Sequence, residues 1–376
     1  MNILYVIDYY HPNIGGGEIV FQNVAERLVD QGHEVTVITS RVTGTSKHEV
    51  VNGVAVYRPW IESRFDRYLF ALSGIPAAVR AARNADVVHT SIFTSCLPAF
   101  KAKMFHGKPL VTTIHEVFDE LWHDLGMGAA SATAHRLAEK CIISLPYDHI
   151  ISVSQYTKDR LVRAGIPADR VTVVYNGLED AFTPRDVSGL RSELGLDGPT
   201  VLYFGRPGVT KGTEHLIRAL PHINDDATFV FMMTKKPQDE YERCVRMIRE
   251  LDLGDRIRLI PSQPREDVPD YVSLGDVVVV PSISEGFGFC AAEASALGRP
   301  VVASRAGSLP EVVKDGVTGI LVEPRDPRAI AEAVNRLLDD PALVGRMGVA
   351  GVEYTKRFTW DEAVKRYLTV YEGLTG

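Results

Sequence analysis

Residues 276–304 read Asp-Val-Val-Val-Val-Pro-Ser-Ile-Ser-Glu-Gly-Phe-Gly-Phe-Cys-Ala-Ala-Glu-Ala-Ser-Ala-Leu-Gly-Arg-Pro-Val-Val-Ala-Ser, and they predict one strand–loop–helix–strand unit. Val277–Val280 is a short β-branched run stopped by Pro281, which is typical of a parallel strand buried on both faces. A helix is expected over about Phe289–Leu297, where a glycine and a proline end it, and Val301–Ala303 predicts the next strand.

The loop between this strand and this helix has the composition of an anion site. Ligands of an open α/β sheet collect where the carboxyl ends of strands meet the starts of helices. Gly286 and Gly288 let the backbone approach a ligand, and the first-turn N–H groups favour a diphosphate. Glu285 and Glu293 span about 12 Å of chain and offer carboxylates to sugar hydroxyls. The residues therefore predict a nucleotide-sugar site, and an ordinary buried strand and helix with two surface glutamates is the alternative.

The segment Glu285-Gly-Phe-Gly-Phe-Cys-Ala-Ala-Glu293 resembles the Glu, seven residues, Glu signature of retaining GT-B glycosyltransferases, in particular glycosyltransferase family 4. The resemblance covers almost the whole chain and is strongest from 200 to 325. It implies an α/β protein with two Rossmann-like doubly wound domains facing a central cleft. It also implies transfer of a sugar from a UDP-, GDP- or ADP-sugar to a hydroxyl acceptor, in glycolipid, glycan or polysaccharide synthesis, with Glu285 holding the transferred sugar and Glu293 the ribose diol.

Composition and charge narrow the class of protein. A chain of 376 residues exceeds what one hydrophobic core usually serves, so two domains are expected. The net charge of −7 lies in the residues after 178, and this balance argues against a nucleic-acid partner. Four scattered cysteines predict neither a zinc site nor a disulfide framework. Without a signal segment or a run of about 20 apolar residues, we expect a cytoplasmic location, reaching at most the inner face of the membrane.

Predicted strands and helices alternate twice along the chain. In the first half, apolar runs predict strands at 3–7, 35–39, 54–57, 86–89, 110–114, 150–153 and 171–174, with helices near 18–31, 66–83, 94–105 and 131–145. In the second half, strands are expected at 201–204, 229–232, 257–260, 277–280 and 301–303, with helices near 211–223, 238–252, 266–274, 289–297, 309–314, 326–338 and 341–356. Two doubly wound halves follow from this alternation.

The domain boundaries are expected at changes in composition. Residues 1–178 form the predicted N-terminal, acceptor-binding domain, and residues 199–359 form the predicted nucleotide-sugar domain. The segment 179–198, rich in Gly and Pro, is interpreted as a linker. The family resemblance implies that the amphipathic segment 360–376 packs back on the N-terminal domain.

Two cations follow the first strand of the second half. Gly205-Arg206 and Lys211-Gly212 resemble the Gly-Arg and Lys-Gly pairs of family 4. Beside an anion-binding helix start, Arg206 and Lys211 would neutralise a diphosphate, each charge-assisted hydrogen bond being worth about 1.5–3 kcal/mol. Since no Asp-x-Asp occurs, we expect no metal and no other cofactor. A surface arginine and lysine are the alternative.

Further site candidates lie in the first half. His115 ends a predicted strand, and the resemblance implies a hydrogen bond to the transferred sugar; a structural histidine is the alternative. Gly16-Gly17-Glu18 resembles the Gly-Gly-x-Glu loop of the family, whereas the spacing of its glycines does not fit an NAD fingerprint. The alternative is a plain tight turn. The candidate catalytic residues are therefore His115, Glu285, Arg206 and Lys211, and the candidate donor-binding residues are Gly16, Gly17, Arg206, Lys211, Glu285, Gly286, Phe287, Gly288 and Glu293.

Two segments depart from the family pattern. Residues 231–237 stand where a Gly-x-Gly turn near the nucleotide is common, and Ser308 stands where a second glycine is common. Donor contacts near these two segments are therefore expected to differ from those of the family.

A basic and aromatic stretch at 58–70 predicts a weak membrane contact. It contains Arg58, Arg64 and Arg67, and a second basic group contains Lys101, Lys103 and Lys108. Basic residues beside Trp, Phe and Leu are typical of salt-sensitive binding to an anionic surface, which would suit a lipid-linked rather than a free sugar acceptor. An ordinary helix with solvated arginines is the alternative. A phosphorylase, a sugar-nucleotide epimerase and an inactive nucleotide-sugar-binding protein remain open as other functions.

Overall fold

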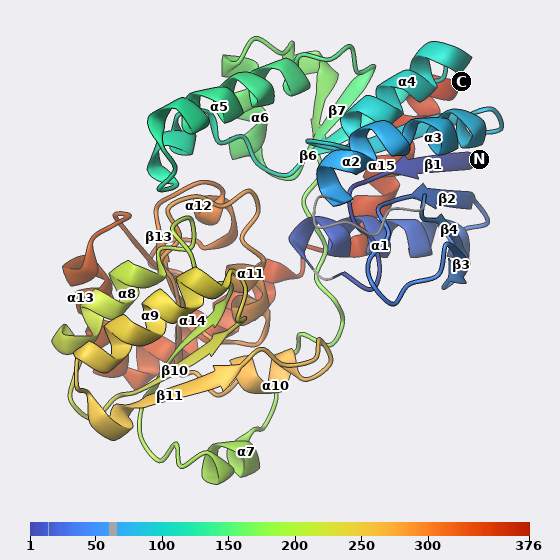
Figure 1. The fold of residues 1–376 in the computed structure, drawn as a ribbon. Coiled ribbons are helices and arrows are strands. Elements are labelled where there is room, and N and C mark those ends of the chain that lie inside the picture. The colour runs from blue at the N-terminus through green and yellow to red at the C-terminus, as the bar shows by residue number, and fades with distance from the viewer. Residues whose placement is uncertain (14, 60–65) are drawn as a thin grey trace. The chain divides into compact units, whose positions relative to one another are not determined.

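The computed structural model describes residues 1–13, 15–59 and 66–376, which form two compact units (Figure 1). The first unit contains residues 1–177 and 358–376, and the second contains residues 178–357. Each unit is built around one sheet whose strands are connected through helices. The doubly wound α/β class predicted from the sequence is confirmed.

The first unit contains an eight-stranded sheet in the order β3-β4-β2-β1-β5-β6-β7-β8. All its neighbouring strands are parallel except the edge pair of β3 and β4, which is antiparallel. The central strands are apolar because helices cover both faces of the sheet. The bounds are β1 Asn2–Val6, β2 Glu34–Ile38, β3 His48–Val51, β4 Val54–Tyr57, β5 Val87–Ser91, β6 Leu110–Ile114, β7 His149–Ser152 and β8 Val171–Val173.

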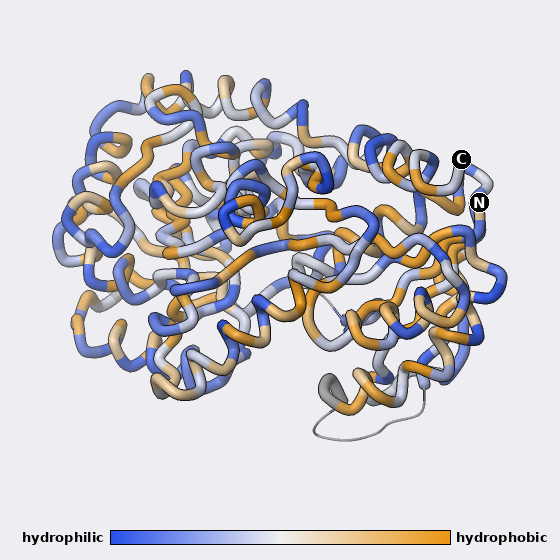
Figure 2. The backbone as a smooth tube through the Cα atoms, turned by 90° about the horizontal axis from the view of Figure 1, so that it is seen from above, coloured by the Kyte–Doolittle hydropathy of each residue, from blue (hydrophilic) through white to orange (hydrophobic). Residues whose placement is uncertain are grey.

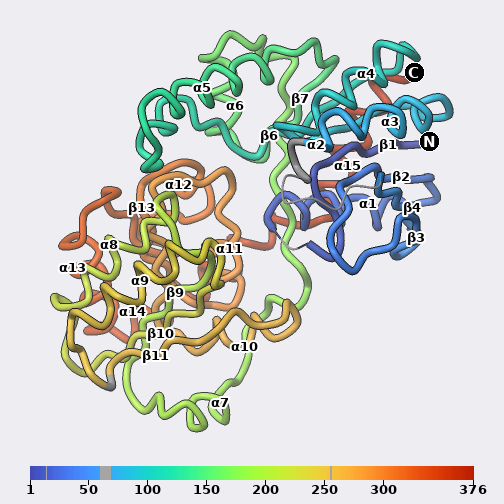
Figure 3. Tube along the Cα trace, viewed as in Figure 1, coloured from blue at the N-terminus to red at the C-terminus, as the bar shows by residue number. Residues whose placement is uncertain are grey.

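Helices α3 and α4 pack together on one side of this sheet, and α1 and α15 pack together on the other (Figure 1). Helix α15 is the last element of the chain, and it lies beside the first helix, so both ends of the chain belong to this unit (Figure 3). The bounds are α1 Gly16–Asp30, α2 Asp66–Ser73, α3 Ile75–Ala82, α4 Cys96–His106, η1 Asp119–Asp124, α5 Ala129–Ile143, α6 Gln155–Arg163, η2 Ala168–Arg170 and α15 Trp360–Thr375.

A buried polar network joins α15 to the sheet. His89 of β5 is fully buried, and its Nδ1 lies 2.5 Å from the Tyr371 hydroxyl while its Nε2 lies 2.8 Å from the Thr113 hydroxyl. The Tyr371 hydroxyl also lies 3.3 Å from that of Tyr5, and Thr113 lies 3.2 Å from the hydroxyl of Tyr367. Because burial penalises the charged imidazole, the pKa of His89 is lowered to about 3. The last helix is therefore fixed by specific hydrogen bonds as well as by apolar packing.

The second unit contains a six-stranded, wholly parallel sheet in the order β11-β10-β9-β12-β13-β14. Strands β9 and β12 are neighbours at its centre, so the loops that follow them start close together. The bounds are β9 Thr200–Gly205, β10 Thr228–Met233, β11 Ile257–Pro261, β12 Val277–Val280, β13 Val301–Ser304 and β14 Gly319–Val322.

The helices of the second unit form two sets, which are joined by a contact between α13 and α14. Helix α8 contacts α9 and α13, whereas α11 contacts α12 and α14. Along the helices, hydrophobic and hydrophilic residues alternate, as expected where one face packs on a core (Figure 2). The bounds are α7 Ser188–Glu193, α8 Thr213–Ala219, η3 Leu220–His222, α9 Gln238–Glu250, η4 Gly254–Arg256, α10 Val268–Val272, α11 Phe289–Ala296, α12 Leu309–Val312, α13 Pro327–Leu338 and α14 Pro341–Thr355.

Several elements differ from the sequence-based expectation. The single helix expected near 66–83 is divided into α2 and α3 at Gly74, where a Cβ atom would lie 2.8 Å from the Phe70 carbonyl oxygen. Strands β3 and β14 and helices α6 and α7 were not predicted; β3 and β14 are four-residue strands at the edges of their sheets. Helix α7 lies inside the segment 179–198 that was interpreted as a linker.

Candidate active site

In the second unit, the loops after β9 and β12 are bonded to each other. The backbone N–H groups of Ile283 and Ser284 donate to the Thr210 carbonyl, at 2.8 and 3.4 Å. Gly212 has a positive φ of 62°, and a Cβ atom there would lie 1.9 Å from the Pro281 carbonyl oxygen. Only glycine combines this backbone conformation with so close an approach. The β9 loop is therefore held against the loop that contains Glu285.

This contact brings two of the predicted site residues together. The Lys211 ammonium donates to Oε1 of Glu285 at 2.6 Å, and the Ser282 hydroxyl donates to the same oxygen at 2.8 Å. The Lys211 and Glu285 side chains are 25% and 10% exposed, so the pair is largely shielded but still reachable from solvent. Charge-assisted hydrogen bonds of this kind are about twice as strong as neutral ones. A cation and a carboxylate are thus both available to one ligand.

The backbone of Glu285 is fixed by the loop after β13. Gly307 has a φ of 58°, and a Cβ atom there would lie 2.3 Å from the Glu285 carbonyl oxygen. Ser308 donates to this oxygen through its N–H at 3.0 Å and through its hydroxyl at 3.1 Å. Ser308, which departs from the family pattern, therefore adds a bond that a glycine could not supply.

The residues after Glu285 form the start of α11. Gly286, Phe287 and Gly288 are all buried, and the Phe287 ring packs against that of Phe289 with centroids 5.1 Å apart. Gly288 is the N-cap residue, with a φ of 91° and no side-chain cap on the first turn. Uncapped N–H groups at a helix start attract an anion.

Glu293 lies on the same helix and is bound by an arginine that the sequence analysis did not single out. The Arg265 guanidinium donates to Oε1 of Glu293 at 2.6 Å and to both oxygens of Glu179 at 3.2 and 3.3 Å. Burial raises the pKa of the Glu293 carboxyl, and the Arg265 charge counteracts part of this effect. By contrast, the Arg206 side chain is exposed and forms no ion pair within the described ranges.

The remaining candidates lie in the first unit. His115 follows β6 directly, and its Nε2 atom is buried without a hydrogen-bond partner among the described residues. A Cβ atom built on Gly17, in the first turn of α1, would lie 3.3 Å from this nitrogen. Phe21 of α1 packs edge-on against the imidazole, with centroids 6.1 Å apart. Burial lowers the pKa of His115 to about 4, so the ring is neutral near pH 7. Gly16, the first residue of α1, stands directly before Gly17.

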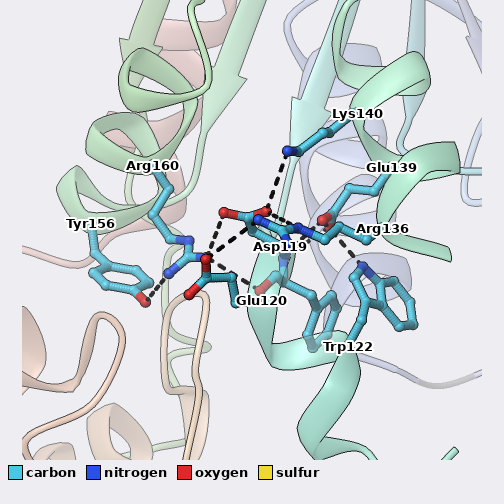
Figure 4. A network of polar contacts seen from close by, with 9 residues as sticks. Asp119, Glu120, Trp122, Arg136, Glu139, Lys140, Tyr156 and Arg160 are labelled. Atoms are coloured by element: carbon cyan, nitrogen blue, oxygen red, sulfur yellow. Dashed lines mark hydrogen bonds and ion pairs between the residues drawn. The ribbon is translucent and has the colours of Figure 1, made fainter. Parts of the chain in front are cut away.

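A polar network fixes the chain just beyond His115 (Figure 4). The buried carboxylate of Glu139 accepts hydrogen bonds from the backbone N–H groups of Phe118 and Asp119, at 2.9 and 2.7 Å, and from Nε1 of Trp122 at 3.2 Å. Arg136 donates to Asp119 at 2.7 Å. The loop after β6 is thereby anchored to α5, and the histidine at its start has a defined position. The sequence carried no motif for this network.

Two family descriptions together match most of the chain. Glycosyltransferase Family 4 matches residues 14–182, and Glycosyl transferases group 1 matches residues 190–353. D-inositol 3-phosphate glycosyltransferase of Xylanimonas cellulosilytica is 30% identical, over 96% of this chain and 92% of that protein. D-inositol 3-phosphate glycosyltransferase 1 of Catenulispora acidiphila is 31% identical, over 78% of this chain and 73% of that protein.

The chain belongs to glycosyltransferase family 4. It is therefore a retaining glycosyltransferase that uses a nucleotide-sugar donor, as the Glu285 to Glu293 signature suggested.

Solved structures agree with this family 4 assignment. Sucrose-phosphate synthase of Thermosynechococcus elongatus has a TM-score of 0.86 and 26% identity, over 99% of this chain and 98% of that one. HepE of Anabaena in complex with UDP-glucose has a TM-score of 0.82 and 22% identity, over the whole of both chains, and supports the fold alone. The predicted GT-B class is confirmed.

Within residues 1–13, 15–59 and 66–376, no group of three His, Cys, Asp or Glu side chains is arranged to hold a metal ion. Among the same residues, no helix combines the length and the apolar character needed to span a bilayer.

Proposed function

We propose that Lys211, Arg206 and the start of α11 bind the donor diphosphate, and that Glu285 holds the transferred sugar. The observation that carries this proposal is the arrangement around Glu285, where Lys211 lies 2.6 Å from one carboxylate oxygen and the uncapped first turn of α11 follows three residues later. Positive charge and sugar-binding oxygens thus lie side by side. This is what a nucleotide sugar requires at the bond that breaks.

The proposed chemistry is governed by charge at the leaving group. When the bond between the anomeric carbon and the diphosphate oxygen breaks, negative charge grows on that oxygen, while the acceptor oxygen forms a new bond to the anomeric carbon on the same face of the sugar. The acceptor hydroxyl loses its proton in this step, and the departing diphosphate takes it up. Arg206, Lys211 and the helix start offset this charge in place of a metal ion. Since a contact that strengthens as charge develops lowers the barrier, these residues act mainly on turnover.

For the first unit, the proposal concerns His115 and the α1 glycines. An imidazole with an unpartnered buried nitrogen suits a neutral hydrogen bond to a hydroxyl of the transferred sugar. Gly17 has no Cβ atom beside that nitrogen, and with Gly16 it leaves room for a ligand. Glu293 is proposed to accept hydrogen bonds from the ribose diol.

The acceptor is proposed to be a hydroxyl of a small phosphorylated ring. The curated relatives described above are D-inositol 3-phosphate glycosyltransferases, so this compound is the first acceptor to test. A sugar or lipid-linked acceptor is the second.

The experiment is a donor screen followed by transfer. Purified protein is mixed with UDP-, GDP- and ADP-sugars, and the donor that raises the melting temperature is then supplied with a radiolabelled sugar and D-inositol 3-phosphate. Label in a new, acceptor-dependent product supports the proposal. Formation of a sugar 1-phosphate from inorganic phosphate would favour the phosphorylase alternative, and epimerisation of the donor sugar would favour the epimerase alternative. Donor binding without any turnover would favour an inactive binding protein.

We also propose a weak contact of the first unit with anionic membranes, through described residues outside the predicted stretch 58–70. Of the predicted stretch 58–70, residues 60–65 and the side chains of 66–68 lie outside the described residues, so the predictions for Arg64 and Arg67 are not tested. Arg58, which is described, is buried against Glu49 and is not part of an exposed surface. Lys103 is bonded to Asp148.

The membrane surface that we propose lies on α3 and α4. Arg80, Arg83 and Phe105 line one cavity of about 400 Å³, and the Phe105 and Met104 side chains are 69% and 60% exposed. Exposed apolar side chains beside cations are the composition of an interfacial contact.

A further inference from the structure

Arg265 connects two distant parts of the second unit. It stands in the segment between β11 and α10, whereas Glu179 is the second residue of the unit and Glu293 lies in the middle of α11. Its Nη2 donates to Glu293 and its Nε to Glu179, so one guanidinium serves two carboxylates. The face of the group lies over the Phe182 ring, 4.6 Å from the centroid. Three neighbours therefore determine its orientation.

The burial of Glu293 makes this contact necessary. The Glu293 side chain is 4% exposed and that of Arg265 is 25% exposed. A buried carboxylate is costly unless a cation and hydrogen bonds compensate for the lost water. Glu179 by itself would raise the pKa of Glu293 further, because it carries the same charge. Arg265 supplies the positive charge that compensates both the burial of Glu293 and the repulsion between Glu293 and Glu179.

The contact also gives the two carboxylate oxygens of Glu293 different roles, because one binds Arg265 and the other is available to a ligand. Oε1 accepts the hydrogen bond from Arg265, and no described donor is bonded to Oε2. The guanidinium is planar and rigid, and Glu179 and Phe182 orient its plane, so Nη2 holds Oε1 of Glu293 at a more strictly defined position than an ammonium would. Oε1 is thus held by Arg265, and the orientation of the carboxylate determines where Oε2 points.

We propose that Arg265 is a positioning residue for nucleotide recognition, which aims the Glu293 carboxylate at the ribose hydroxyls and is itself braced by Glu179. This inference rests on the proposed role of Glu293. It adds a residue that does not touch the nucleotide but sets the preference for ribose over 2′-deoxyribose. It also makes the first residues of the second unit part of the donor site, since Glu179 follows Leu178, the first residue of that unit.

The test compares the affinities of a ribo- and a 2′-deoxyribonucleoside diphosphate. The nucleoside diphosphate selected by the donor screen and its 2′-deoxy form are titrated by calorimetry against wild type, Arg265→Gln, Glu179→Gln and Glu293→Ala. Wild type is expected to prefer the ribo form about tenfold or more, the size of one hydrogen bond to a charged group. Arg265→Gln is expected to reduce this preference to within about threefold of unity, and Glu179→Gln to give an intermediate value.

Arg185 provides a matched control. It also ties the segment after Leu178 to α10, donating to Asp270 at 2.8 Å and to the Ala181 carbonyl at 2.9 Å, but its recorded bonds do not include Glu293. Arg185→Gln is therefore expected to leave the ribose preference unchanged. If Arg265→Gln does not fold, Arg265→Lys serves instead, and it is expected to lose at least about threefold of the preference because an ammonium lacks the fork.

The outcomes separate the two proposals. If Glu293→Ala keeps the wild-type preference, the ribose role of Glu293 fails, and the inference about Arg265 fails with it. If Glu293→Ala loses the preference while Arg265→Gln or Arg265→Lys keeps it, the inference about Arg265 alone is overturned. If Arg265 had a merely structural role, its replacement would lower the affinities for the ribo and the 2′-deoxy ligand equally. The ratio of the two affinities would then stay as in the wild type.

Discussion

Nζ of Lys211 lies 2.6 Å from Oε1 of Glu285, although the two residues are 74 positions apart in the chain. The contact exists because β9 and β12 are adjacent in the sheet and because Gly212 lets the two loops touch. This ion pair has restricted access to water, and a bound donor can replace its contact: Lys211 can bind a diphosphate and Glu285 a sugar hydroxyl. We expect five experimental outcomes, some for this site and some for the first unit.

The first concerns metal ions. Because Arg206, Lys211 and the start of α11 supply positive charge, we expect donor cleavage to need no divalent cation. Initial rates measured in excess EDTA should equal those measured with Mg²⁺ or Mn²⁺. Activity that EDTA abolishes and Mg²⁺ or Mn²⁺ restores would contradict the assignment of leaving-group stabilisation to these residues.

The second expectation distinguishes the roles of the two glutamates of the signature, Glu285 and Glu293. Glu293→Ala should weaken donor affinity by about 1.5–3 kcal/mol, because it removes hydrogen bonds to a charged group that are present before and during transfer. Glu285→Ala should lower turnover more than affinity, since a contact to the transferred sugar strengthens as the bond breaks. Calorimetric donor affinity and initial rates on both variants decide between them. Equal effects on both quantities would remove the division of roles.

The sequence could predict the architecture and the residues in contiguous motifs, but not their partners. Alternating apolar runs located the two sheets, and Glu285, Glu293 and the Arg206–Lys211 segment were visible as local patterns. Arg265 was not, because it stands in an irregular segment and its importance depends on contacts with Glu179 and Glu293.

The same limit applies to the first unit. The hydrogen bonds of His89 with Tyr371 and Thr113 join residues far apart in sequence. Arg58 was predicted to be part of an exposed basic surface because it stands in a basic and aromatic stretch. The structure instead shows it buried against Glu49. Whether such a polar side chain is buried or exposed depends on partners far away in the sequence, and the local composition does not show which partners these are.

The third expectation compares two glycines with the same backbone conformation. Gly307 and Gly316 have φ values of 58° and 72°, but a Cβ atom on Gly307 would lie 2.3 Å from the Glu285 carbonyl oxygen, whereas one on Gly316 meets nothing within 4 Å. Gly316→Ala should therefore cost only about 1–2 kcal/mol of backbone strain. Gly307→Ala should cost at least about 3 kcal/mol and lower activity, because the backbone of Glu285 must move.

Urea unfolding and initial rates provide the measurements for this pair of variants. Gly316→Ala should retain wild-type turnover, so it controls for strain alone. Equal losses of stability and of turnover in the two variants would show that the close approach to Glu285 has no consequence.

The fourth expectation concerns acid. The pKa of His115 is lowered to about 4 in the folded protein and is about 6.5 in an unfolded chain. Between these values the unfolded state binds more protons, so the free energy of unfolding falls as the pH falls from about 6.5 to about 4 and changes no further from this residue below that. The contribution of His115 between pH 7 and pH 5 is about 2 kcal/mol.

Comparing wild type with His115→Gln isolates this contribution between pH 7 and pH 5. Burial is the main cause of the lowered pKa of His89, and the smaller effect of a charge on His115 is nearly absent in this range because the pKa of His115 is about 4. The wild type should lose about 2 kcal/mol more stability than the variant between pH 7 and pH 5 in urea titrations. Parallel pH dependences of the two proteins would mean that the pKa of His115 is the same in the folded and the unfolded protein, which would conflict with the burial on which its proposed hydrogen-bonding role rests.

The last expectation concerns the surface of α3 and α4. Arg80 and Arg83 are exposed beside Phe105, and each cation near an anionic membrane contributes about 1 kcal/mol, so binding should be weak, reversible and lost at high salt. Co-sedimentation with anionic liposomes at low and high salt measures it. Arg80→Glu/Arg83→Glu should reduce low-salt binding at least about tenfold. Lys103→Glu provides the contrast, because Lys103 is already paired with Asp148 and should affect binding less. No low-salt binding by the wild type, or binding indifferent to the double substitution, would leave a soluble acceptor as the better interpretation.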